Sequence, residues 1–82
     1  MGEKRRVEWT STGKHRWSSE LIDHGRKARL RVWRDDSVLF FDYHCEVKVK
    51  DKTGSVTRGA WCPNGKDARS TAERLLGQIL DG

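Results

Sequence analysis

The chain has 82 residues, of which 34% are hydrophobic and 35% charged, and its formal net charge is +5. This length predicts one domain with a single small core, in which the four tryptophans must supply much of the buried area. No stretch is apolar enough for a signal peptide or a membrane span, so we expect a cytoplasmic protein without a membrane partner.

Basic residues are concentrated in the first part of the chain. Residues 1–34 hold ten Lys/Arg against four Asp/Glu, whereas residues 35–82 hold seven against eight. This asymmetry favours an anionic partner, of which nucleic acid is the most common. Residues 1–6 are predicted to form a flexible basic arm, either a frayed terminus or a segment that contacts phosphate. The cations of this arm are Lys4, Arg5 and Arg6.

Residues 7–82 are predicted to form one α+β domain, with a sheet over about 7–62. Residues 15–22 are predicted as a strand, and a short helix over 18–24 is the alternative. A turn at 23–26 would place Leu21 opposite Ala28, Glu20 opposite Arg29 and Trp17 on the core side.

Residues 26–62 contain three stretches of β-type residues separated by turn residues, which predicts an antiparallel meander. The turn after residue 50 places Val49 opposite Val56, and the turn after Trp33 places Val32 opposite Leu39, Leu30 opposite Phe41 and Ala28 opposite Tyr43. Because side chains alternate along a strand, both registers give the same core face. That face consists of Ala28, Leu30, Val32, Leu39, Phe41, Tyr43, Cys45, Val47, Val49, Val56, Ala60 and Cys62. We expect the two cysteines to be buried free thiols rather than a disulfide.

The opposite side of the predicted sheet combines aromatic and cationic residues. Its members are Arg29, Arg31, Trp33, Val38, Phe40, His44, Glu46, Lys48, Lys50, Thr57, Gly59 and Trp61. A monomer rarely leaves a large apolar patch in water. We therefore expect either a partner or the N-terminal segment, with Trp9 and Trp17, to cover this side.

A helix is predicted over about 66–80, because Pro63 ends the sheet and an apolar stripe follows. Asn64 or Asp67 is the predicted N-cap, and Gly77 is interpreted as a point of close packing. The stripe consists of Ala68, Ala72, Leu75, Leu76 and Ile79. The predicted fold class is thus α+β: an antiparallel meander of three to five strands with one C-terminal helix packed on one face.

The sequence gives no indication of catalysis. It holds no phosphate-binding glycine loop, no Cys-x-x-Cys pair and no nucleophile signature. His44 and Cys45 are adjacent on a strand and point to opposite faces, which argues against a shared zinc ion. We expect no enzymatic activity, no cofactor and no metal.

Three segments of the second half resemble a known class of nucleic-acid-binding domain. They are HCEVKVK at 44–50, TRGAW at 57–61 and NGKDARSTAERLL at 64–76. Together they resemble the last two strands and the final helix of a double-stranded RNA-binding domain, which implies phosphate contacts by Lys66 and Arg69. The order of three strands and a helix also resembles the arm-type DNA-binding modules of integrases.

The first functional hypothesis is a non-enzymatic module that binds RNA or DNA. Four cations of the sheet would contact phosphate, two tryptophans would stack on bases, and the arm and the helix start would add backbone contacts. The sheet residues concerned are Arg29, Arg31, Lys48, Lys50, Trp33 and Trp61.

The second hypothesis is a protein-binding inhibitor or adaptor, of the kind that phages and mobile elements encode. Its partner would be an acidic protein or a nucleoprotein complex. Trp33, Val38, Phe40 and Trp61 would form the anchor, with arginines at the rim. A homodimer joined through the same side of the sheet is a further alternative.

Overall fold

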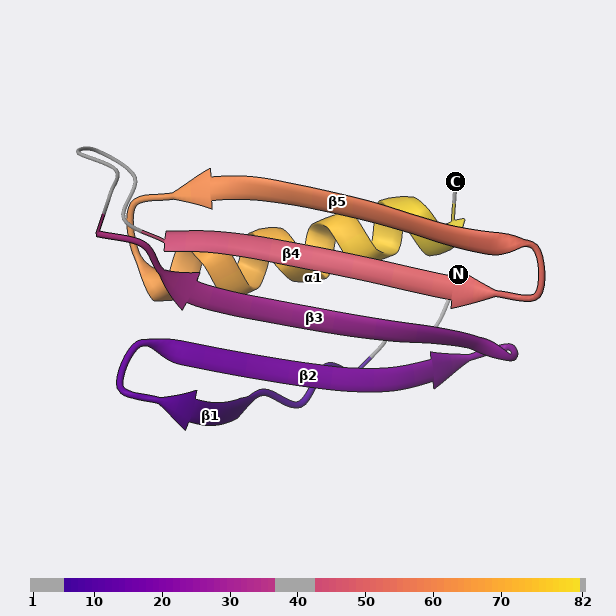
Figure 1. Cartoon of the computed structure of the whole chain (residues 1–82), viewed down its shortest axis with the longest axis horizontal. Helices are drawn as coiled ribbons and strands as arrows, with labels where there is room; N and C mark the ends of the chain where they lie inside the picture. Colours follow the sequence, from indigo (N-terminus) through magenta and orange to yellow (C-terminus); the bar gives the residue numbers. More distant parts are fainter. Residues whose placement is uncertain (1–5, 37–42, 82) are drawn as a thin grey trace.

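The computed structural model describes residues 6–36 and 43–81, which form a five-stranded antiparallel sheet and one helix (Figure 1). The strands neighbour one another in chain order, as in a meander. The elements are β1 (Thr10–Gly13), β2 (Arg16–Asp23), β3 (Arg26–Arg34), β4 (Tyr43–Asp51), β5 (Gly54–Cys62) and α1 (Gly65–Asp81). The predicted fold class is confirmed. No helix among the described residues is long and apolar enough to span a membrane.

The β2–β3 hairpin has the predicted register. Leu21 lies opposite Ala28 and Glu20 opposite Arg29, within a ladder that runs without interruption along β2. The two turn residues, His24 and Gly25, have φ angles of 51° and 80°. Positive φ at both central positions is the geometry of the tight hairpin turn that matches strand twist. The alternative helix over 18–24 is therefore wrong.

The β4–β5 hairpin also has the predicted register, with Val49 opposite Val56. The Asp51 carboxylate holds the turn, because its Oδ1 accepts hydrogen bonds from Thr53 N at 2.7 Å, Thr53 Oγ1 at 2.6 Å and Gly54 N at 3.2 Å. These bonds lower the pKa of Asp51 below its usual 3.8. Gly54 follows with a φ of 146°, which other residues rarely adopt.

The predicted register between β3 and β4 is wrong. Val32 pairs with Cys45 and Leu30 with Val47, a shift of six residues from the predicted partners Leu39 and Phe41, which lie outside the described residues. The observed register gives β4 a full-length neighbour on each side, so the apolar positions of three strands align beneath the helix. Since six is an even number, the side chains of the paired residues 27–34 and 43–50 keep their predicted faces.

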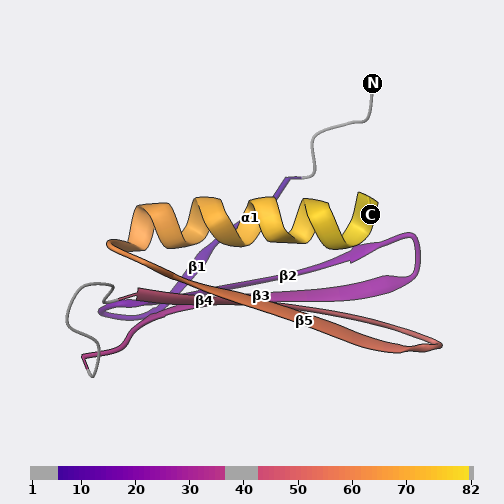
Figure 2. The ribbon, with the colours of Figure 1, turned by 90° about the horizontal axis from the view of Figure 1, so that it is seen from above.

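The core lies between the sheet and α1, which covers one face only (Figure 2). Asn64 is the N-cap, since its Oδ1 accepts a 2.8 Å hydrogen bond from Asp67 N. The buried apolar residues are Ala28, Leu30, Val32, Cys45, Val47, Val49, Cys62, Ala68, Ala72, Leu76 and Leu80. Most members of the predicted stripe are among them, whereas Leu75 and Ile79 are half-buried and pack at the margin.

Close packing occurs at Gly65 and not at Gly77, where we predicted it. A Cβ added at Gly65 would lie 2.8 Å from Cη2 of Trp17, whereas one at Gly77 would meet no neighbouring atom within 4 Å. Trp17 is held from a second side by Arg69, whose guanidinium lies 4.6 Å from the ring centroid. The indole of Trp17 therefore packs against the first turn of the helix.

Candidate functional site

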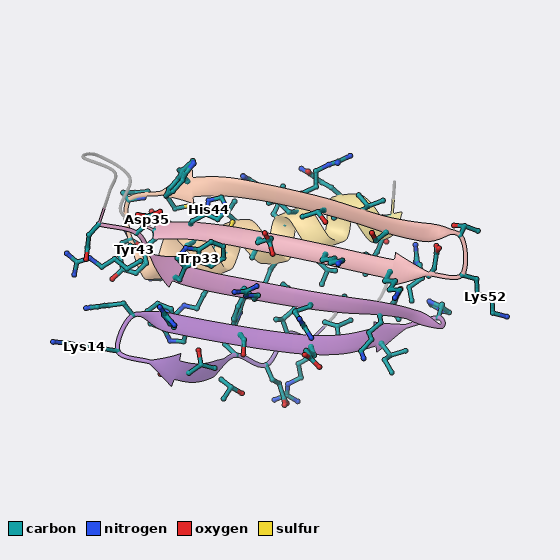
Figure 3. All side chains as sticks on the ribbon, viewed as in Figure 1. Lys14, Trp33, Asp35, Tyr43, His44 and Lys52 are labelled. Atoms are coloured by element: carbon teal, nitrogen blue, oxygen red, sulfur yellow. The ribbon has the colours of Figure 1, made fainter. Side chains whose placement is uncertain are left out.

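The face of the sheet turned away from α1, here called the outer face, carries the most unusual chemistry of the molecule. Figure 3 views the sheet from this side, with the helix behind it. The registers arrange β2 to β5 in four cross-strand rows: Arg16, Trp33, His44, Trp61; Ser18, Arg31, Glu46, Gly59; Glu20, Arg29, Lys48, Thr57; and Ile22, Lys27, Lys50, Ser55. Aromatic residues therefore gather at one end of the face and cations over the rest.

The N-terminal segment does not cover the outer face within the described part of the chain. Trp9 packs against the core on the helix side, and its Nε1 donates a 2.9 Å hydrogen bond to Glu73 Oε2 of α1. Trp17 also points to that side, towards Gly65. Trp61 remains 44% exposed. The alternative in which Trp9 and Trp17 cover the outer-face aromatics is therefore wrong.

Three rings form a continuous aromatic row across β3, β4 and β5. The His44 ring centroid lies 4.7 Å from that of Trp33 and 4.5 Å from that of Trp61, with interplanar angles of 57° in both pairs. Figure 3 shows His44 and Trp33 side by side at the end of the sheet where β4 begins. Gly59 makes room for the imidazole, because a Cβ there would lie 3.2 Å from His44 Nε2 and 3.0 Å from Cys45 O.

His44, the central ring of this row, has a buried ring nitrogen, Nδ1, without a hydrogen-bond partner in the described part of the chain. Enclosing a polar atom without a partner costs folding free energy, and such atoms in native proteins call for an explanation. A purely structural stack would be better served by an apolar ring at this position.

The outer face is strongly basic. Across the four rows six cations stand against two carboxylates, those of Glu20 and Glu46. Arg29 Nε lies 3.2 Å from Glu20 Oε1, and Arg31 Nη1 lies 3.9 Å from Glu46 Oε1. Because these side chains are largely exposed, each pair contributes at most about 1 kcal/mol.

Like charges also stand directly opposite one another on this face. Lys27 pairs with Lys50, and Arg29 pairs with Lys48. Opposed like charges destabilise a sheet, by up to about 1 kcal/mol for a pair. The arrangement is therefore unfavourable for the isolated fold and favourable for an anion laid over the face.

The predicted site residues fall on two sides of the molecule. Arg29, Arg31, Trp33, Lys48, Lys50 and Trp61 come together on the outer face. Lys66 and Arg69 lie on α1, across the sheet from them, and Arg69 is engaged with Trp17 and with the Gly65 carbonyl at 3.3 Å. Arg6 is exposed and lies 3.8 Å from the Glu8 carboxylate, while Lys4, Arg5 and Phe40 lie outside the described residues.

The structure adds residues that were not singled out from the sequence. Arg16 joins the aromatic row opposite Trp33, and Lys27 joins the cations opposite Lys50. Ser18 and Thr12 line a hollow beside Trp33. The predicted β2–β3 register already contained the signal for Arg16 and Lys27, since pairing Leu21 with Ala28 fixes both positions.

The cysteines belong to the core. Cys45 and Cys62 are both buried and free, as predicted, and Cys62 Sγ lies 3.5 Å from Thr71 Oγ1. Burial, with a smaller contribution from neighbouring Cys62, raises the pKa of the Cys45 thiol to about 11. Such a thiol is inert at neutral pH. Among residues 6–36 and 43–81, no three His, Cys, Asp or Glu side chains gather in a way that could hold a metal ion.

No protein-family model, curated protein or solved structure matches this chain. The function is therefore inferred from the chemistry of the outer face.

Proposed function

We propose that this chain is a non-enzymatic nucleic-acid-binding module that uses the outer face of its sheet. The observation that carries the proposal is the coincidence of six cations and a row of three rings on a face that no described element covers. Phosphate is the anion that such a spread of cations would neutralise, and bases are the planar groups that stack on exposed rings.

The phosphate contacts would come from Arg29, Lys48 and Lys50, joined by Lys27 and Arg16. All five residues are exposed, and they lie on the adjacent strands β2, β3 and β4. If four phosphates of a single strand are neutralised, affinity should fall about 50-fold between 50 and 200 mM salt through counterion release. A steep salt dependence is thus the first property to measure.

The base contacts would come from the aromatic row. Trp61 lies on edge strand β5, with His44 as its neighbour on one side and 44% of its surface exposed. Stacking of one base on such a ring contributes about 1–3 kcal/mol. The row therefore adds an attraction that salt does not screen.

The resemblance to double-stranded RNA-binding domains would instead place phosphate on Lys66 and Arg69. We favour the outer face because Arg69 is already committed to Trp17 and Gly65, and because α1 offers few other cations beside it.

The test is fluorescence anisotropy with labelled RNA and DNA, single- and double-stranded, at 50 and 200 mM salt. The double variant Lys48→Ala/Lys50→Ala should lose at least tenfold in affinity. Lys52→Ala is the control for the loss of one charge outside the rows, because Lys52 is exposed in the β4–β5 turn. An affinity that is the same at both salt concentrations, or equal losses in the variant and the control, would refute the proposal.

A second candidate function is protein binding through the same face, as an inhibitor or adaptor. The exposed indole of Trp61 favours it, since tryptophan is enriched among the residues that carry most of the binding energy in protein interfaces. This candidate predicts that Trp61→Ala abolishes the interaction while the double lysine variant mainly slows association. Failure of every nucleic acid to bind at 50 mM salt would favour it.

A further inference from the structure

Two hollows on the outer face differ in chemistry. The first, here called the Trp33 hollow, has a volume of about 410 Å³ and is lined by Thr12, Arg16, Trp17, Ser18, Arg31, Val32 and Trp33. Trp17 and Val32 point to the core, so they contribute main chain to its floor. The hollow thus combines an indole wall, two guanidinium groups and two hydroxyls. These are the groups that a base, a phosphate and a sugar require.

Arg31 lies where its guanidinium can contact both the Trp33 ring and a phosphate group of a ligand in this hollow. The Arg31 guanidinium carbon lies 5.3 Å from the centroid of the Trp33 ring. Its ion pair with Glu46 is long, at 3.9 Å, and largely exposed, so it leaves the guanidinium available to a stronger acceptor. Arg16 lies opposite Trp33 in the same row and is exposed.

The second hollow, here called the lysine groove, has a volume of about 240 Å³ and is lined by Lys27, Arg29, Lys48 and Lys50. It contains no aromatic ring on which a base could stack and no carboxylate in its lining. Two pairs of like charges face each other across β3 and β4 at this point. Phosphate oxygens would relieve that repulsion, whereas a neutral base would not.

The two hollows lie at opposite ends of the same strands. Trp33 and Lys27 are six residues apart on β3, which corresponds to about 20 Å along the strand. That length equals about six nucleotides at the 3.4 Å spacing of a stacked strand, and fewer if the strand is extended. A ligand that fills both hollows is therefore a short polymer of about four to six units.

The separation of the Trp33 hollow, which has a ring, from the lysine groove, which has none, favours a single strand over a duplex. In a duplex the bases are stacked on one another and present only their edges in the grooves, so the half-buried indole of Trp33 has no base face to meet unless a step is unstacked, at a cost of a few kcal/mol. A duplex also presents phosphates on both sides of a groove, whereas the outer face has its opposed cations towards one end. In a single strand, bases and phosphates are separately accessible.

We infer that the ligand of the outer face is a single-stranded nucleic acid, with one base against Trp33 in the Trp33 hollow and the phosphates several nucleotides away in the lysine groove. This inference rests on the proposed function and specifies its substrate class. It also assigns Arg16, Arg31, Ser18 and Thr12 to the nucleotide that occupies the Trp33 hollow.

The experiment compares fluorescein-labelled oligothymidine and oligouridine of two to twelve units with a hairpin duplex of equal charge, by anisotropy at 50 mM salt. A further oligonucleotide keeps every phosphate and replaces the central bases by abasic sites. Single strands should bind at least tenfold tighter than the duplex, and affinity should rise steeply up to about six nucleotides. The abasic oligonucleotide should bind about tenfold more weakly than its parent.

Two variants connect these effects to the hollow. Arg16→Ala changes an exposed side chain and should weaken single-strand binding without altering the melting temperature. Trp33→Phe keeps a ring beside His44, and it should reduce the difference between the parent and the abasic oligonucleotide. The relative affinities for thymidine and uridine oligonucleotides distinguish DNA from RNA as the source of the strand.

The possible results separate this inference from the proposed function. Equal or tighter binding of the duplex, or equal binding of the parent and abasic strands, would overturn the single-strand inference and leave nucleic-acid binding in place. Absence of binding to every oligonucleotide at 50 mM salt would overturn both. Tight single-strand binding that Arg16→Ala and Trp33→Phe leave unchanged would show that the base does not enter the Trp33 hollow.

Discussion

Replacing Lys50 by Glu should stabilise the fold and weaken nucleic-acid binding at the same time. Lys50 stands directly opposite Lys27 and lines the lysine groove. The substitution removes a like-charge pair and creates an opposite-charge pair. Each change contributes about 0.2–1 kcal/mol, so the free energy of unfolding should rise by about 1 kcal/mol. For a domain of this length, that raises the melting temperature by about 4–8 °C.

Binding should change in the other direction. The Lys50→Glu protein loses one phosphate contact and gains a repulsive carboxylate in the groove, so the slope of log affinity against log salt should fall by about one. Thermal unfolding followed by circular dichroism and anisotropy titrations at several salt concentrations measure both effects. Low salt should be used for the melts, because screening weakens exposed charge pairs.

Lys52→Glu is the matched control for this prediction. It changes the net charge by the same amount, but Lys52 lies in the β4–β5 turn and has no cross-strand cation opposite it. Its melting temperature and salt slope should stay close to those of the parent protein. If Lys50→Glu destabilises the fold, or if both variants lose the same affinity, then local charge opposition on the outer face does not govern binding.

Three further predictions concern the framework behind the face. Gly65→Ala should destabilise the fold by about 1–3 kcal/mol in chemical denaturation, because the new methyl group would lie 2.8 Å from the ring of Trp17. Gly77→Ala should instead stabilise the fold by about 1 kcal/mol, because alanine favours a helix and no neighbouring atom is within 4 Å. Equal effects of the two substitutions on the free energy of unfolding would contradict the close packing at Gly65. The hydrogen bonds of the turn lower the pKa of Asp51, so they stabilise the fold above its usual 3.8 and lose that effect as the pH falls through the lower, folded-state value. The difference in melting temperature between the parent and Asp51→Ala should accordingly be largest near neutral pH and shrink below about pH 4. Native Cys45, whose pKa burial raises to about 11, should react with a thiol reagent at pH 8 far more slowly than in the unfolded chain.

The face on which each side chain lies could be predicted, because it depends only on whether the register is correct to within an even number of residues. The β2–β3 and β4–β5 registers followed from short turns whose residue types fix the loop length. The β3–β4 register was six residues out, because β4 begins only at Tyr43, whereas the prediction began it directly after the turn signal at 34–37. Hydrophobic alternation cannot detect an even-numbered error, since it places every side chain on the same face.

The composition of the candidate site was therefore predictable, while its geometry was not. The wrong register separated Trp33 from His44, although both were assigned to one face, so the row that they form with Trp61 could not be foreseen. The same error hid the opposition of Lys27 and Lys50. Gly59 shows the limit most clearly, because a Cβ there would lie 3.2 Å from His44 Nε2, and no sequence pattern encodes that closeness.

The two faces of the sheet obey different rules, and that contrast locates the function. On the core face, propensity, alternation, capping and packing all favour the same structure, as expected where selection acts on folding. On the outer face, like charges stand opposite one another and Trp61 stays exposed. The Nδ1 atom of His44 is buried there without a hydrogen-bond partner among the described residues. Each of these features costs stability, and all three occur on one face of the same three strands, β3, β4 and β5. Departures from local consistency that cluster on one surface are expected at a binding site, because there the ligand completes the interactions that the fold alone leaves unfavourable.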